Sequence, residues 1–104
     1  MLRFLDLSEN RNITNEGLAR LKVLTQLTGL NLSSCSISSS GINHLRDLTH
    51  LETLNLSFCN RLNDPALKTL ESMRNLTFVD IQGCLGITKG GLSRVRRRSL
   101  VIYR

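Results

Sequence analysis

A leucine repeat constrains the fold of this chain more than any other feature. Each of four full segments begins with a leucine and has aliphatic residues at the third and fifth positions after it, the pattern L-x-x-L-x-L. The leading leucines recur at intervals of 25, 24, 25 and 24 residues: Leu2, Leu27, Leu51, Leu76 and Leu100. A fixed period of this length is typical of repeat proteins, in which each repeat is one small structural unit. We therefore expect a single array over residues 1–104, with repeats 2–26, 27–50, 51–75 and 76–99 and a terminal strand 100–104.

Each repeat combines a strand pattern with a helix pattern. The aliphatic residues at every second position after the leading leucine indicate a short strand with one buried face. The second half of the repeat spaces its apolar residues three apart, as in Leu18, Leu21 and Leu24, which is typical of one face of a short helix. A hydroxyl or amide residue that can cap a helix precedes each of these stretches. The four predicted caps are Thr14, Ser38, Asn63 and Thr88.

No single repeat can bury its own leucines, because one strand and one short helix leave a side of every apolar residue in water. Neighbouring repeats must therefore stack, strand beside strand at about 4.8 Å, into a parallel sheet. Helices are wider than strands, so the stack curves with the strands on the concave face and the helices on the convex face. Aromatic residues make up only 4% of the chain, so the core must be aliphatic. The predicted fold class is an α/β solenoid, a right-handed arc of about four full repeats plus a terminal strand.

One column of the repeat holds a small amide or thiol side chain: Asn10, Cys35, Cys59 and Cys84. With this column, segments such as LETLNLSFCNRLNDPALKTL and LTFVDIQGCLGITKGGL resemble the leucine-rich-repeat family, and within it the cysteine-containing class. The resemblance covers the whole chain and implies a leucine-rich-repeat solenoid that binds other proteins. Repeats of this class are most similar to the substrate-receptor portion of F-box ubiquitin ligases. The resemblance therefore implies a non-catalytic module for substrate or partner recognition, with a ubiquitin-ligase complex as its context.

The side chains that alternate with the buried strand residues point out of the concave face and form the candidate contact surface. Phe4, Phe78 and Ile102 are apolar residues at such positions, and large exposed apolar groups are the usual anchors of an interface. The alternative is that these residues cover the open ends of the stack. The Asp and Asn residues of the neighbouring row either bind polar groups of a partner or keep the sheet soluble. The predicted protein-binding residues are Phe4, Asp6, Asn31, Asn55, Phe78, Asp80 and Gln82.

The net charge of +6 belongs to one end of the chain, since basic and acidic residues cancel over residues 1–88. The cluster consists of Arg94, Arg96, Arg97 and Arg98. One interpretation is a polar cap for the array, because Arg97 takes a place that an apolar residue takes in the other repeats. The other is an anion-binding patch for phosphate, an acidic partner or nucleic acid. A platform for single-stranded nucleic acid needs interleaved aromatic residues, which this cluster lacks, so the sequence does not favour nucleic acid.

The sequence contains no pattern of catalysis or metal binding. The thiol column shares its position with an asparagine, so we expect a structural role in which a small side chain turns inward against backbone groups. His44 and His50 do not recur in other repeats and have no metal-ligand spacing. The glycines after residue 82 lie in a turn whose equivalents in other repeats are not glycine, unlike a phosphate-binding loop. We expect no enzyme, no metal and no cofactor.

Other features of the sequence indicate the cellular compartment and the nature of the ends of the array. No apolar run approaches the roughly 18 residues of a membrane span, so we expect no membrane association. Three cysteines make no disulfide framework, which fits the cytoplasm or the nucleus. The array begins directly on a strand, which predicts an open apolar edge. That edge either belongs to a longer leucine-rich-repeat protein, of which the chain is a piece without independent activity, or pairs with another chain in self-association.

Overall fold

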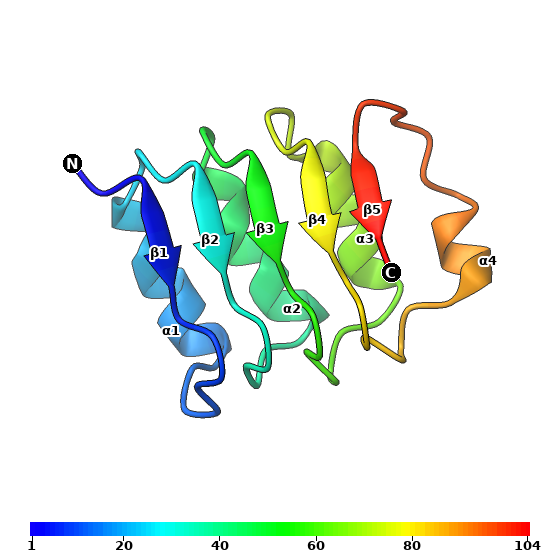
Figure 1. Cartoon of the computed structure of the whole chain (residues 1–104), viewed down its shortest axis with the longest axis horizontal. Helices are drawn as coiled ribbons and strands as arrows, with labels where there is room; N and C mark the ends of the chain where they lie inside the picture. Colours follow the sequence, from blue (N-terminus) through cyan, green and yellow to red (C-terminus); the bar gives the residue numbers. More distant parts are fainter.

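The computed structural model describes residues 1–104 and contains one parallel sheet whose five strands follow the chain order β1-β2-β3-β4-β5. In Figure 1 the strands lie side by side in one layer, the helices of the first three repeats lie behind them, and the helix of the fourth repeat lies beside β5. Parallel neighbours need a crossover between each strand and the next, and a helical segment in every repeat supplies it. The predicted α/β solenoid is confirmed. The strands are β1 Phe4–Asp6, β2 Gly29–Asn31, β3 Thr53–Asn55, β4 Phe78–Asp80 and β5 Val101–Tyr103.

The helices are short because each repeat has to cover only one strand of the sheet. They are α1 Asn15–Arg20, α2 Ser39–Ile42, α3 Pro65–Ser72 and α4 Lys89–Leu92. A 3-10 turn continues α1 over Leu21–Val23 and α2 over Asn43–Asp47. Three of the four predicted caps directly precede their helices. The prediction of Asn63 is wrong by one residue: α3 begins after Asp64, because Pro65, which has no N–H to leave unpaired, occupies the first helical position.

The core is a single aliphatic and thiol cluster of 24 buried residues between the sheet and the helices. The strand register stacks equivalent residues of consecutive repeats: Leu30 pairs with Leu54, and Leu54 with Val79. All three side chains are almost fully buried, as the strand pattern predicts. Leu5 and Leu7 of the first repeat are only partly buried, since they have a neighbouring repeat on one side only.

The register of β5 differs from the leucine spacing. Phe78 pairs with Val101 and Val79 pairs with Ile102, one residue earlier than the leading leucines predict. Ile102 therefore packs against the core, and the prediction that it faces solvent beside Phe78 is wrong. Counted in residues, the step from Phe78 to its partner Val101 is 23, against 25, 24 and 25 for the steps between the earlier strands. Val101 and Tyr103 are the exposed residues of this strand.

Candidate protein-binding face

The exposed face of the sheet carries most of the residues that the sequence predicts as contacts. Five of the seven line one shallow hollow of about 330 Å³, while Asp6 and Gln82 lie outside its lining. Phe4 on β1 and Phe78 on β4 lie at its two sides, and β2 and β3 form its floor. The residues that line the hollow are Phe4, Leu30, Asn31, Thr53, Leu54, Asn55, Phe78 and Asp80.

Gly29 explains how Phe4 reaches this hollow. The two residues are direct partners in the register of β1 and β2. A Cβ atom on Gly29 would lie only 2.7 Å from Cδ1 of Phe4, so any larger residue would displace the aromatic ring. The missing side chain lets the ring of Phe4 lie across β2 and border the hollow from that side.

An Asp or Asn residue is the last residue of each of the strands β1 to β4. In each repeat the side-chain Oδ1 accepts a hydrogen bond from the backbone N–H two residues further along, at 2.9 to 3.0 Å. This local turn satisfies the backbone where the chain leaves the sheet. Hydrogen bonds from the Ser8 side chain and backbone N–H also lower the pKa of the Asp6 carboxyl. The row consists of Asp6, Asn31, Asn55 and Asp80, and each keeps its second polar atom for other contacts.

A left-handed residue follows each of the first four strands, and the one after β3 is an exposed phenylalanine that the sequence analysis missed. Glu9, Ser34, Phe58 and Gly83 have φ values of 58°, 58°, 60° and 76°. This conformation is costly for a bulky residue such as Phe58. Gly83 has no side chain to obstruct the ring of Phe58, which lies against it. No sequence pattern distinguishes Phe58 from the serine and glutamate at equivalent positions.

The cysteines hold the loops of neighbouring repeats together. Cys35, Cys59 and Cys84 are buried, and each Sγ–H donates to the carbonyl of a leucine in the preceding repeat, at 3.2, 3.1 and 3.0 Å. Burial raises the pKa of all three thiols, that of Cys59 to about 11. A thiol that stays protonated at neutral pH is a poor nucleophile and a poor metal ligand. The structure contains no group of three or more His, Cys, Asp or Glu side chains that could hold a metal ion.

Arg97 differs from the other arginines of the basic cluster. Its guanidinium donates to the backbone carbonyls of Glu71 at 3.0 Å and Met73 at 2.7 Å, and also to that of Leu76. These carbonyls lie at and beyond the C-terminal end of α3, where helical carbonyls lack partners and a cation is favoured. The Glu71 carboxylate accepts the backbone N–H groups of Arg96 and Arg97 in return.

This geometry separates the two interpretations of the cluster. The guanidinium of Arg97 is partly buried and bound to backbone carbonyls, which agrees with the interpretation as a cap, and the anion site stays a prediction. The side chains of Arg94, Arg96 and Arg98 are exposed. They follow α4, which ends at Leu92, and Figure 1 shows this segment leading back to β5.

β1 is an outer strand of the sheet, and its apolar flank is open. Met1 and Leu2 are exposed, and Leu5 is only partly buried. The longest helix, α3, has eight residues, and none of the helices has the length and hydropathy needed to cross a bilayer.

Comparison with known families identifies the repeat. A family model described as "Leucine Rich repeat" matches residues 1–22 and 47–70, and a second with the same description matches residues 26–48. These segments together make up more than half of the chain. The parallel strands, the helical crossovers and the leucine core agree with the match. The chain belongs to the leucine-rich-repeat family.

Solved structures show the same fold. Among 17 matching chains is one from the crystal structure of the Rad7 and Elc1 complex in yeast, with a TM-score of 0.64 and 21% sequence identity. The match covers 97% of this chain and 32% of the other, so this chain spans about a third of the length of that protein. No curated protein matches in sequence.

Proposed function

We propose that the chain is a non-catalytic protein-interaction module that recognises a partner through the exposed sheet face. The placement of the aromatic residues carries this proposal. The chain has three Phe, one Tyr and no Trp, and none of the four aromatic side chains is in the core. Phe4, Phe78 and Tyr103 lie on the sheet face with exposed fractions of 60, 37 and 52%, and Phe58 is 49% exposed in the turn after β3.

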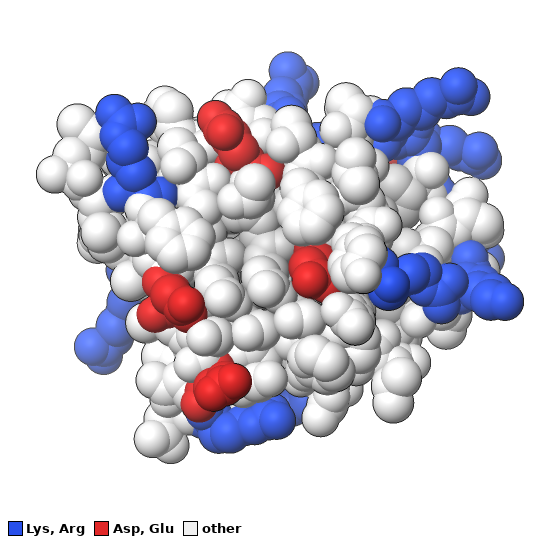
Figure 2. Space-filling view, in the orientation of Figure 1, with Lys and Arg blue, Asp and Glu red and all other residues white.

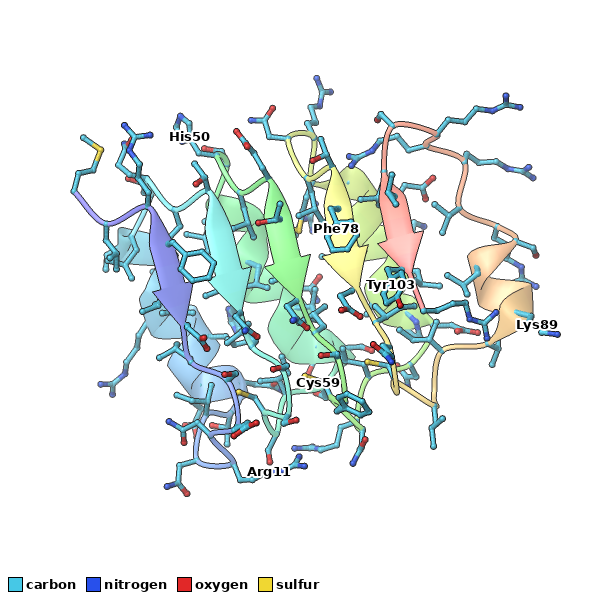
Figure 3. The ribbon with its side chains drawn as sticks, in the orientation of Figure 1. Arg11, His50, Cys59, Phe78, Lys89 and Tyr103 are labelled. Carbon is cyan, nitrogen blue, oxygen red and sulfur yellow. The ribbon has the colours of Figure 1, made fainter.

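Aromatic residues at the surface need a reason, because burying one would stabilise the fold more than leaving it in water. In this chain leucine, isoleucine and cysteine fill the core, and the aromatic side chains gather on one side of it. Figure 3 shows Phe78 on β4 and Tyr103 on β5 lying over the sheet, on the side away from the helices. Interfaces are enriched in Tyr and Phe, which anchor binding with little loss of conformational entropy. The sheet face has this composition.

The resemblance to the cysteine-containing repeats of F-box proteins supports a narrower proposal for the context. The thiol column is built into the fold as a bridge between repeats. A matching structure comes from a complex of two proteins, Rad7 and Elc1. On these grounds we propose that the partner is a protein recruited to a ubiquitin ligase, in the cytoplasm or the nucleus.

A capture experiment with matched variants tests the binding face. The chain is immobilised, and the proteins it retains from a cell lysate are compared between wild type and the double variant Phe4→Ala, Phe78→Ala. The control is Val23→Ala with Leu85→Ala, which truncates two exposed apolar side chains away from the hollow. Circular dichroism checks that each variant is folded. We expect the first variant to lose proteins that wild type and the control retain. Equal retention by all three folded proteins would contradict the proposal.

A further inference from the structure

We propose that the hollow between Phe4 and Phe78 binds an arginine or lysine side chain from a partner peptide that lies across the strands. This inference rests on the proposed function and adds the chemistry of the partner. The face of an aromatic ring attracts a cation within about 6 Å of its centre. Two rings border this hollow, and the aliphatic stem of Arg or Lys would lie against the ring edges.

The charge of the hollow is opposite to that of the whole chain. The chain has a net charge of +6, yet the lining of the hollow contains one carboxylate, Asp80, and no lysine or arginine. In Figure 2, which looks onto the sheet face, acidic side chains lie within the outline and most Lys and Arg side chains project around its edge. Complementary charge steers partners and selects among them. The centre of this face therefore favours a cation, while an acidic or phosphorylated peptide would bring an anion against Asp80.

The row of Asp and Asn residues offers hydrogen-bonding atoms that suit such a peptide. Because each Oδ1 accepts the N–H of the strand-end turn, the remaining atoms are Oδ2 of Asp6 and Asp80 and Nδ2 of Asn31 and Asn55. The amides on the two central strands, about 4.8 Å apart, can donate to the carbonyl oxygens of a peptide. The carboxylates on β1 and β4 can accept from a guanidinium or an ammonium group. Across β1 to β4 the row reads acceptor, donor, donor, acceptor.

Peptide titration of the 104-residue chain tests the inference directly. The probe is an acetylated and amidated peptide of alanines around one central arginine, and its matched control carries glutamine in place of arginine. Binding is followed through the backbone amide signals of the chain in heteronuclear NMR spectra at low salt. We expect the arginine peptide to produce saturable shifts at Thr53, Asn55, Asp80 and Gln82, and the glutamine peptide to produce much smaller ones. Added salt should lower the affinity of the arginine peptide for the chain, because the attraction is partly electrostatic.

Asp80→Asn is a conservative test of the charge. Asn31 and Asn55 make the same turn bond at their strand ends, so the substitution keeps the Oδ1 acceptor and replaces the charged Oδ2 by an amide donor. We expect this variant to bind the arginine peptide about two- to fivefold more weakly, the range for an exposed ion pair. Glu16→Gln removes a carboxylate from α1 on the helix side and should leave the affinity unchanged. Equal affinity of Asp80→Asn and wild type would overturn the inference.

The two proposals fail in different ways. If the arginine and glutamine peptides behave alike while capture from the lysate still depends on Phe4 and Phe78, the cationic occupant is wrong and the binding face stands. If the arginine peptide binds in the hollow but capture does not depend on the two phenylalanines, the proposed function is wrong. Shifts confined to residues outside the hollow would overturn the inference as well, since the peptide would then bind elsewhere.

Discussion

Thr88 donates two hydrogen bonds to the Asp64 carboxylate, from its backbone N–H to Oδ1 at 2.8 Å and from its hydroxyl to Oδ2 at 2.6 Å. The Thr88 hydroxyl also accepts the N–H of Gly91 and so caps α4. The bonds therefore tie the start of one helix to the start of the next. The equivalent pairs in earlier repeats are Asn15 with Ser38 and Ser39 with Asn63. Besides the apolar core, a column of polar contacts between helix starts joins the repeats.

The Asp64 contact predicts a pH dependence of stability. The hydrogen bonds from Thr88, its side chain first and its backbone second, lower the pKa of the Asp64 carboxyl below the ordinary 3.8. A lowered pKa in the folded state stabilises the fold above the unfolded value, and this contribution is lost as the pH falls through the folded value. We expect wild type to be more stable than Asp64→Asn near neutral pH, with the difference shrinking below about pH 4. Urea unfolding at several pH values measures the difference in free energy of unfolding between the two proteins. A difference that does not change with pH would contradict the prediction.

Gly90 and Gly91 should respond in opposite ways to alanine, although both lie in α4. A Cβ on Gly90 meets only Oγ1 of Thr88, at 3.8 Å, whereas a Cβ on Gly91 would collide with the Asp64 carboxylate. Replacing an unconstrained helical glycine by alanine stabilises by about 0.5–1 kcal/mol. We therefore expect Gly90→Ala to raise the free energy of unfolding and Gly91→Ala to lower it. Equal shifts in urea denaturation would show that the Asp64 contact does not constrain Gly91.

Arg97 should matter for stability far more than Arg98, its exposed neighbour. Arg97→Ala removes the donor to the carbonyls of Glu71 and Met73, of which the Met73 carbonyl still accepts the N–H of Leu76. Hydrogen bonds from a charged donor contribute about 1.5–3 kcal/mol, and we expect a loss of this order. Arg98→Ala should change the free energy of unfolding by less than about 0.5 kcal/mol. Thermal or urea unfolding of the two variants compares them, and similar losses would show that the guanidinium contacts of Arg97 do not stabilise the end of the array.

The raised pKa of the Cys59 thiol predicts a loss of stability at high pH. Burial raises the pKa of its thiol from the ordinary 9.0 to about 11. The buried neutral thiol therefore stabilises the fold below about pH 9, and the contribution is lost as the pH rises toward 11. Between these values wild type should lose about 2–3 kcal/mol more than Cys59→Ser, whose hydroxyl does not ionise. The other titrating groups are shared, so they cancel in the comparison. If the free energies of unfolding of wild type and Cys59→Ser, measured in urea, fell equally as the pH rises, the raised pKa of Cys59 would be refuted.

The repeat pattern was enough to predict the sheet and its core. Leu30, Leu54 and Val79 stack because their positions follow a period that every interior repeat shares. Ile102 lies on the other face because the step from β4 to β5 has one residue fewer than the leucine spacing predicts. These two outcomes show that periodicity predicts interior repeats better than terminal ones.

The candidate site was predictable in its members but not in its shape. The alternation along the strands places Phe4 and Phe78 on one face. The hollow between them depends on Gly29, whose missing side chain matters only once β1 and β2 are paired. Arg97 is a similar case, because the carbonyls that it binds are brought to it by the end of α3. Contacts of this kind join residues of different repeats and leave no local pattern in the sequence.

The exclusion of aromatic residues from the core has a spectroscopic consequence. With no tryptophan, the main fluorophore of the chain is its single tyrosine, Tyr103, which is paired with Asp80 in the sheet. Its ring is already half exposed in the folded protein, so its emission depends less on unfolding than that of a buried ring. A ligand without tyrosine or tryptophan that settles beside Asp80 would change the emission of Tyr103, and the unlabelled chain thus carries its own optical reporter of occupancy.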